Sequence, residues 1–320
     1  MAVPKAFFER ALAAEDRVRE QGTGARRGRG NLEGSSLAQV KSRLRRLNVR
    51  VLKGLGQHFL IDRSVLETVI SAAELGPGDT VVEVGPGLGI LTEELVRRAG
   101  KVIAVEVDSK LALALGRKLY QVPQLTVLNA NVLELEPGEL VSAHTSASGD
   151  VPGYKVVANL PYYLASPILR HFLEALLKPN LMVVMVQKEV GQSIVTEPGR
   201  MSLLGVSVQL YGKPTIVAYV PAPSFYPQPK VESAILRIDV YPRPVVDVAD
   251  ASGFFWVVKA GFSAPRKQLR NALSLGLHVG TSEVIELLEQ AGIAPQRRPQ
   301  TLSLEEWAQV YRVFASRDKR

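Results

Sequence analysis

The segment Asn159-Leu160-Pro161-Tyr162 could do the most specific chemistry in this chain. It follows the apolar run 155–158, which predicts a buried strand. The Asn159 amide oxygen and the Leu160 carbonyl could each accept one N–H from an exocyclic amine such as that of adenine, which would free its lone pair for attack. Pro161 fixes the backbone angle, and Tyr162 offers a flat face to a base. The plainer interpretation is an Asn-Pro turn beside a core tyrosine.

Three glycines, Gly85, Gly87 and Gly89, form a second feature with a chemical use. They follow the apolar run 80–84 and precede a helical pattern, an order that predicts strand, glycine turn and helix. In such a turn the backbone comes close to a ligand because no side chain intervenes. Glu106 lies 21 residues after Gly85, at a distance that suits gripping the two hydroxyls of a ribose.

The spacing of the glycines indicates which nucleoside cofactor they serve. A dinucleotide site has Gly-X-Gly-X-X-Gly, whereas here the pattern is Gly-X-Gly-X-Gly. Glu83, just before the turn, would repel a pyrophosphate and suits a cationic sulfonium with an amino-acid tail. The sequence therefore favours S-adenosylmethionine over NAD, and a glycine turn without a ligand is the plainer alternative.

Composition excludes several other kinds of protein. The 320 residues include no cysteine, which excludes disulfides, thiolate zinc sites and methylation through a covalent cysteine adduct. Four scattered histidines show no metal-ligand spacing, so we expect no metal. No apolar run reaches ~18 residues and no apolar signal core is present, so we expect a cytoplasmic protein without a membrane span. We also expect the protein to act as a monomer.

Positive charge is concentrated near the start of the chain. The first 60 residues carry a net charge of +8, which equals that of the whole chain. Basic residues often only solvate a surface, but a run beside a base-handling site favours contacts with nucleic-acid phosphates. The residues expected to make these contacts are Arg43, Arg45, Arg46 and Lys53.

Apolar runs alternate with helical patterns, which predicts an α/β fold with a Rossmann-like parallel sheet. The predicted strands are residues 80–85, 102–107, 125–129, 155–159 and 181–187. Ligands bind at the carboxyl ends of such strands. Four of the candidate site residues fall at these ends, namely Gly85, Glu106, Asn131 and Asn159.

The rest of the chain divides around this sheet. Residues 1–36 are expected to be a flexible basic extension, residues 37–241 the sheet domain, and residues 242–320 a small all-helical domain. A proline-rich loop within the sheet domain carries Phe225, which could stack on a flipped base. Ordinary aromatic packing of Phe225 is an equal alternative.

Together these motifs resemble the ribosomal RNA small-subunit adenine N6,N6-dimethyltransferase family. The resemblance extends from about residue 37 to residue 311 and rests on several motifs in the same order. They are Gly-Leu-Gly-Gln-His-Phe-Leu-Ile-Asp at 54–62, Glu-Val-Gly-Pro-Gly-Leu-Gly at 83–89, Val-Glu-Val-Asp at 105–108, Asn-Leu-Pro-Tyr at 159–162, and the segments 187–190, 225–231 and 262–271.

The resemblance implies an S-adenosylmethionine-dependent methyltransferase of ribosome biogenesis. Such an enzyme dimethylates two adjacent adenines near the 3′ end of 16S rRNA, on the small ribosomal subunit or its precursor. The positions that match the family's cofactor site are His58, Leu60, Gly85, Gly87, Glu106, Asn131 and Asn159. Those that match its adenine site are Asn159, Leu160, Pro161, Tyr162 and Phe225, and those that match its rRNA-docking surface are Arg266, Lys267 and Arg270.

Two positions depart from the family's usual pattern. His58 stands where the family usually has Asn, and Asn131 stands where it usually has an Asp that accepts a hydrogen bond from the cofactor's adenine amine. Asn131 can still accept that bond, without charge assistance, at a cost of ~1 kcal/mol of affinity.

Two alternatives are open. The macrolide-resistance enzymes methylate an adenine of large-subunit rRNA, but they more often have Ile at the position of Leu160. The second alternative is a non-catalytic assembly factor or nucleic-acid-binding protein that keeps the fold. Intact Gly85, Glu106 and Asn159 argue against it.

Overall fold

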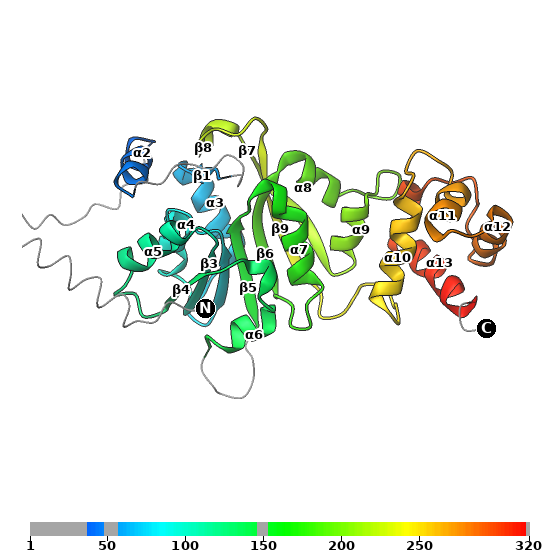
Figure 1. Ribbon diagram of the computed structural model, residues 1–320, viewed down its shortest axis with the longest axis horizontal. Coiled ribbons are helices and arrows are strands. Elements are labelled where there is room, and N and C mark those ends of the chain that lie inside the picture. The colour runs from blue at the N-terminus through cyan, green and yellow to red at the C-terminus, as the bar shows by residue number, and fades with distance from the viewer. Residues whose placement is uncertain (1–36, 48–56, 146–152, 318–320) are drawn as a thin grey trace, which may run out of the picture. The chain divides into compact units, whose positions relative to one another are not determined.

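The computed structural model describes residues 37–47, 57–145 and 153–317 (Figure 1). The predicted extension 1–36 and Lys53 lie outside these residues. The chain divides into two compact units. The first comprises the described residues up to Gln187 together with Val217–Arg237, and the second comprises Lys188–Ile216 and the described residues from Ile238 onward.

A seven-stranded sheet carries the strand order β4-β3-β2-β5-β6-β9-β7. Its strands are β2 (Thr80–Val84), β3 (Lys101–Glu106), β4 (Leu125–Asn129), β5 (Tyr154–Asn159), β6 (Leu181–Gln187), β7 (Gly212–Val220) and β9 (Ser233–Val240). The strands from β4 to β6 are parallel. The predicted α/β fold with a Rossmann-like sheet is therefore confirmed. The order reverses between β2 and β5, so a ligand crevice is expected where these two strands end.

The described part of the first unit contains six helices and three 3₁₀ turns. They are α2 (Leu37–Arg46), α3 (Arg63–Ala73), α4 (Ile90–Leu95), α5 (Ser109–Lys118), α6 (Pro137–Ser142) and α7 (Ala165–Leu173), with the 3₁₀ turns η2 (Val132–Glu134), η3 (Tyr162–Leu164) and η4 (Ala222–Ser224). Asp62 caps α3 because its side chain accepts a hydrogen bond from the Ser64 N–H at 3.0 Å.

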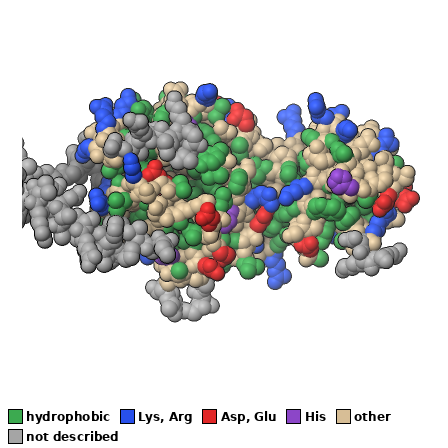
Figure 2. Space-filling view, viewed as in Figure 1, with side chains coloured by type: hydrophobic (Ala, Val, Ile, Leu, Met, Phe, Trp, Pro, Cys, Tyr) green, Lys and Arg blue, Asp and Glu red, His purple; other side chains and the backbone are tan. Residues whose placement is uncertain are grey.

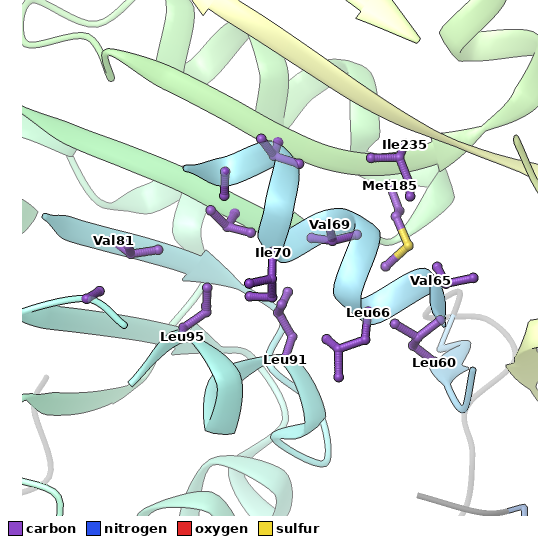
Figure 3. Close-up of a cluster of buried hydrophobic side chains, with 14 of the residues drawn as sticks. Leu60, Val65, Leu66, Val69, Ile70, Val81, Leu91, Leu95, Met185 and Ile235 are labelled. Atoms are coloured by element: carbon purple, nitrogen blue, oxygen red, sulfur yellow. The ribbon is translucent and has the colours of Figure 1, made fainter. Parts of the chain in front are cut away.

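One hydrophobic cluster joins α3 and α4 to the sheet (Figure 3). Val69 of α3 and Leu95 of α4 are completely buried there against Val81 of β2. Val82, the next residue of β2, is also completely buried and faces the other side of the sheet, because strand side chains alternate. Burial on both faces explains why the strands are continuous apolar runs in the sequence.

A two-stranded antiparallel sheet joins two segments that are distant in the sequence. Its strands are β1 (Phe59–Leu60) and β8 (Phe225–Tyr226), and Leu60 pairs with Phe225. The Ile61 N–H donates to the Ser224 carbonyl at 2.9 Å, next to this pair. The proline-rich loop is thus held against the segment that precedes α3.

The second unit is largely helical. Its helices are α8 (Lys188–Ile194), α9 (Leu203–Gln209), α10 (Ala251–Phe262), α11 (Leu269–Leu277), α12 (Thr281–Gln290) and α13 (Leu304–Arg317), with the 3₁₀ turn η5 (Pro299–Thr301). Trp307 is its largest completely buried side chain. The unit includes α8 and α9, which the predicted boundary at residue 241 assigns to the sheet domain. Among the described helices, none is both long and apolar enough to cross a membrane.

Candidate cofactor and substrate-base site

A cavity opens at the carboxyl ends of β2, β3 and β5. Its lining residues come from segments that the sequence predicts to converge there. They include all the candidate cofactor residues (His58, Leu60, Gly85, Gly87, Glu106, Asn131 and Asn159) and, from the adenine motif, Leu160, Pro161 and Tyr162. Among the residues that the structure describes, Phe225 is absent from this lining. The predicted convergence at the sheet edge is therefore present.

The glycine turn brings backbone close to the cavity. Gly85 and Gly87 have φ angles of +66° and +56°, a region that side chains disfavour. A Cβ at Gly85 would meet no atom within 4 Å, so open space lies beside this glycine. A Cβ at Gly87 would lie 3.0 Å from the Phe59 ring. The turn thus leaves room for a ligand on one side and packs closely on the other.

Glu106 closes the end of β3 and is only 5% exposed. Its Oε2 accepts a hydrogen bond from the Gly87 N–H at 3.0 Å, and its Oε1 accepts one from the Asp108 N–H at 2.9 Å. Burial raises the pKa of Glu106, and these two backbone donors oppose the rise. A carboxylate held in this way keeps further lone pairs for ribose hydroxyls.

Glu83 lies below the turn and is 1% exposed. Burial, with a smaller contribution from Glu106, raises the pKa of Glu83 to about 8. Among the described residues, no group forms a hydrogen bond with its buried Oε2. A buried, unsatisfied carboxyl at the edge of the cavity is suited to a cationic ligand, and it supports a sulfonium cofactor with an ammonium tail over a pyrophosphate.

Asn159 ends β5 and faces the segment before α3. Its Nδ2 donates a hydrogen bond to the backbone carbonyl of His58 at 2.8 Å. Because the nitrogen is held there, the Oδ1 atom is oriented away from His58 and can accept an N–H. The Leu160 N–H donates to the Met185 carbonyl at 3.2 Å, which fixes the peptide that follows Asn159. Both acceptors of the predicted amine site are therefore held by the backbone.

Tyr162 is half-buried and is held at both ends of its side chain. Its hydroxyl lies 2.5 Å from the Ser233 Oγ, and its ring stacks on His58 with centroids 5.3 Å apart and planes at 27°. Burial raises the pKa of Tyr162, and the Ser233 hydrogen bond opposes the rise. His58 is fixed in turn, because its Nδ1 lies 2.6 Å from the Pro227 carbonyl. The histidine therefore links Tyr162 to the proline-rich loop.

Phe225 does not present its ring to the cavity. It is 2% exposed and belongs to the core cluster with Leu60 and Val65. Phe225 therefore anchors the loop through ordinary aromatic packing in the core. The base-stacking contact expected from the sequence stays a prediction, since it requires the ring to become accessible.

Asn131 lies after β4 and caps the 3₁₀ turn η2. Its Oδ1 accepts a hydrogen bond from the Leu133 N–H at 3.2 Å, and its Nδ2 donates to the Glu134 Oε1 at 2.8 Å. The side-chain oxygen retains one lone pair that can accept a further N–H. Asn131 has no carboxylate of its own, but the carboxylate of Glu134, three residues later, accepts its hydrogen bond.

The predicted RNA-binding residues lie in two places. Arg43, Arg45 and Arg46 form the basic last turn of α2 in the first unit. Arg266, Lys267 and Arg270 lie at the start of α11 in the second unit, with Arg266 and Lys267 exposed. Cations are unfavourable at the positive end of a helix, so their position at this N-terminus is suited to binding an anion.

Sequence reasoning missed three residues that shape the site. Tyr163 lines the cavity and is 54% exposed, and its place beside Tyr162 could have indicated it. Ser233 and Pro227 contact the site through a hydroxyl and a carbonyl. Neither residue type nor spacing in the sequence signals these two contacts. Among the described residues, no group of His, Cys, Asp and Glu could hold a metal ion.

Comparisons with known proteins give one matching family model and several similar proteins. Residues 49–316 match the family model described as ribosomal RNA adenine dimethylase. A protein of Dehalococcoides mccartyi (strain ATCC BAA-2266 / KCTC 15142 / 195), named ribosomal RNA small subunit methyltransferase A, is 48% identical over 280 residues, which cover 88% of this chain and 94% of that protein. A protein of the same name from Moorella thermoacetica is 45% identical and covers 82% of this chain and 92% of its own length.

Two solved structures share the fold. The 23S rRNA methyltransferase ErmE superposes with a TM-score of 0.61 at 28% identity, covering 80% of this chain and 99% of its own. A dimethyladenosine transferase from Plasmodium falciparum gives a TM-score of 0.66 at 22% identity, covering 82% and 98%. The second likeness concerns the fold alone.

Proposed function

The chain belongs to the ribosomal RNA adenine dimethylase family, and we propose that it dimethylates the N6 atoms of two adjacent adenines near the 3′ end of 16S rRNA. The observation that carries this proposal is the position of Asn159 at the cavity edge. Its Nδ2 is tied to the His58 carbonyl at 2.8 Å, so its Oδ1 is available to an amine.

S-adenosylmethionine fits the lining of the cavity, and when bound it would supply an electrophilic methyl group on a sulfonium. Glu106 would hold the ribose hydroxyls through the lone pairs that Gly87 and Asp108 leave open. The Asn131 Oδ1 would accept from the adenine amine of the cofactor. Glu83 would face the cationic end, where its negative charge is stabilised by a nearby cation.

The chain's own residues would activate and orient the target amine. The Asn159 Oδ1 and the Leu160 carbonyl accept its two N–H groups and thereby release its lone pair. Pro161, with a φ of −59°, fixes the peptide between the two acceptors and the ring of Tyr162. The amine loses its proton after the methyl group is transferred, so solvent can serve as the base and catalysis rests on alignment.

The small-subunit substrate is favoured over that of the macrolide-resistance enzymes. Relatives named for the small subunit are 45% and 48% identical over more than four fifths of this chain, whereas ErmE is 28% identical. Leu160 and the basic start of α11 support the same choice. We place the protein in the cytoplasm as a monomer that binds the small subunit or its precursor through Arg266, Lys267 and Arg270.

The test is transfer of labelled methyl groups from S-adenosylmethionine to unmethylated small subunits, large subunits and naked rRNA, with Asn159→Ala as the control. We expect label on adenines near the 3′ end of small-subunit rRNA. Label on the large subunit would favour a resistance-type enzyme. Tight subunit binding without any label would favour a non-catalytic assembly factor.

A further inference from the structure

A groove separate from the cofactor cavity runs between α2 and α5. Four of its lining side chains are cationic, two from the last turn of each helix. These are Arg43, Arg46, Arg117 and Lys118. The described residues contribute no carboxylate to this lining. We call this region the α2–α5 groove; its volume of about 690 Å³ is large enough for several groups of a polymer backbone.

The cations of the α2–α5 groove lie close enough to act on one another. Glu93 of α4 forms ion pairs with both Arg43 and Lys118. Cations are common in the last turn of a helix, where they offset the helix dipole. Here, however, two such turns face one groove and repel each other. The pKa of Arg43 is lowered by burial and by Arg46, and the pKa of Lys118 is lowered by burial and by Arg43, although its pair with Glu93 acts in the opposite direction.

The α2–α5 groove shares a wall with the cofactor cavity. Gly87 and Leu88 line both. The Arg43 Nη1 donates a hydrogen bond to the Leu88 carbonyl at 3.1 Å, and the Lys41 Nζ of α2 lies 5.2 Å from the centre of the Tyr226 ring. Helix α2 therefore contacts the glycine turn and the proline-rich loop at once.

We propose that the α2–α5 groove binds backbone phosphates of the substrate RNA that flank the target adenines, with Lys118 and Arg117 of α5 completing the basic edge of α2. The inference rests on the proposed function. The groove extends from Gly87 at the glycine turn to the end of α5, which suits successive phosphates of a polymer better than one small anion. Figure 2 shows Lys and Arg side chains gathered over this end of the first unit.

Phosphate binding would relieve the repulsion within the α2–α5 groove. Each phosphate adds a negative charge among cations whose pKa values are lowered by burial and, to a smaller extent, by neighbouring cations. Such contacts position RNA and contribute little to the choice of base. They also make affinity depend on salt concentration, because each neutralised phosphate releases counterions.

The test compares two double charge reversals with the same change in net charge. The first is Arg46→Glu with Arg117→Glu, in the α2–α5 groove. The matched control is Lys213→Glu with Arg243→Glu, an exposed pair of cations in the second unit. Binding of an RNA fragment from the 3′ end of small-subunit rRNA is measured at several KCl concentrations, together with binding of S-adenosylmethionine.

We expect the groove variant to lose about tenfold or more in RNA affinity, and its plot of log affinity against log salt to flatten by about one to two units. The control should change by less than about threefold, and both variants should bind S-adenosylmethionine as the wild type does. Equal loss of RNA affinity in both variants, or none in the groove variant, would overturn the proposal. Arg46→Gln with Arg117→Gln should show about half the effect and serves if the glutamate variant does not fold.

Two further outcomes show whether the groove proposal or the proposed function itself is wrong. Inorganic phosphate is added to the wild type at the ionic strength of a chloride control. Stronger displacement of RNA by phosphate than by chloride is expected if the groove holds phosphates, and equal displacement by the two anions would contradict the proposal. A wild-type protein that binds and methylates no rRNA would contradict the proposed function itself, whatever the variants do.

Discussion

Asn159 and His58 are joined by a hydrogen bond from the side-chain Nδ2 of one to the backbone carbonyl of the other, at 2.8 Å. This bond decides which way the amide points, because an amide whose nitrogen is held turns its oxygen elsewhere. The orientation of the proposed acceptor is thus set by a backbone atom, which a substitution of the His58 side chain does not remove.

Replacing Asn159 by Ala should abolish the acceptor and leave the cavity otherwise intact. We expect the turnover number to fall about 10²- to 10³-fold, the usual effect of losing one preorganised hydrogen-bonding group, with a modest loss of cofactor affinity. Single-turnover methyl transfer and calorimetry measure the two quantities. Asn159→Asp is the companion variant. It keeps an acceptor but cannot donate to the His58 carbonyl, so misorientation should also slow transfer; near-normal turnover in either variant would remove Asn159 from its role.

Tyr162 should act through its ring. Tyr162→Phe loses only the contact with the Ser233 hydroxyl, so we expect activity within about threefold of the wild type. Tyr162→Ala removes a stacking face worth about 1–3 kcal/mol per base and should raise the KM for RNA and lower kcat. Steady-state kinetics with a fixed concentration of S-adenosylmethionine measures both. If Phe and Ala are equally harmful, the hydroxyl carries the function.

Glu83 should make stability depend on pH. Its pKa is about 8 in the folded chain and 4.5 when unperturbed, so the folded state keeps a proton that the unfolded state loses. The stabilisation is complete below about pH 4.5 and is lost as the pH rises through about 8. Glu83→Gln lacks this loss and should be more stable than the wild type by about 4 kcal/mol at pH 8, with little difference at pH 4.5.

Denaturant unfolding at both pH values measures this difference in stability, and a difference that does not change with pH would contradict the prediction.

Glu83 should also couple cofactor binding to proton release. A cation near Glu83 favours its charged form, so affinity for S-adenosylmethionine should rise with pH towards about 8 and then level off. Glu83→Gln should show no such rise, which calorimetry in two buffers of different ionisation enthalpy can detect.

Asn131 should respond to substitution only together with Glu134. Asn131→Asp would place a carboxylate at the position where the Nδ2 now donates to Glu134, so repulsion should offset the gain from a charged acceptor. The double change Asn131→Asp with Glu134→Gln removes the repulsion and should tighten S-adenosylmethionine binding about fivefold, equivalent to about 1 kcal/mol. If the single variant binds as tightly as the double one, Glu134 has no part in the effect.

The cations at the start of α11 should serve docking. Arg266→Glu with Arg270→Glu is expected to weaken small-subunit binding about tenfold or more and to leave cofactor affinity unchanged, because phosphate contacts dominate such affinities. Lys213→Glu with Arg243→Glu provides an exposed, charge-matched control in the same unit. Sedimentation with small subunits and calorimetry give the two affinities. Parallel loss of both affinities would indicate misfolding.

The parallel sheet and the convergence of Gly85, Glu106 and Asn159 could be predicted from the sequence. Buried strands are apolar runs, and the carboxyl ends of parallel strands meet at one edge, so local patterns are sufficient there. The pairing of β1 with β8 could not be predicted in this way. Each strand has only two residues and therefore no periodicity, and the pairing joins Leu60 to Phe225 across most of the sheet domain.

The same limit explains the residues that were missed or placed differently. Ser233 contacts Tyr162 only because β9 lies in the same sheet as β5. Phe225 is buried in the core cluster that also contains side chains of α3, and the sequence of the loop alone does not indicate this burial. The division of the chain near Gln187 depends on how α8 and α9 pack, and packing partners are not encoded in local composition.

The pairing of β1 with β8 also has a consequence for protein engineering. Residues 57–62 and 224–227 are bound to each other by the Leu60–Phe225 pair, the His58–Pro227 contact and the hydrogen bond from the Ser224 hydroxyl to Asp62. A chimera that takes one segment from a relative and keeps the other from this chain would join two segments whose contacting residues are not matched to each other. The two segments are therefore a single exchangeable module, and their mutual contacts are kept only when both are exchanged together.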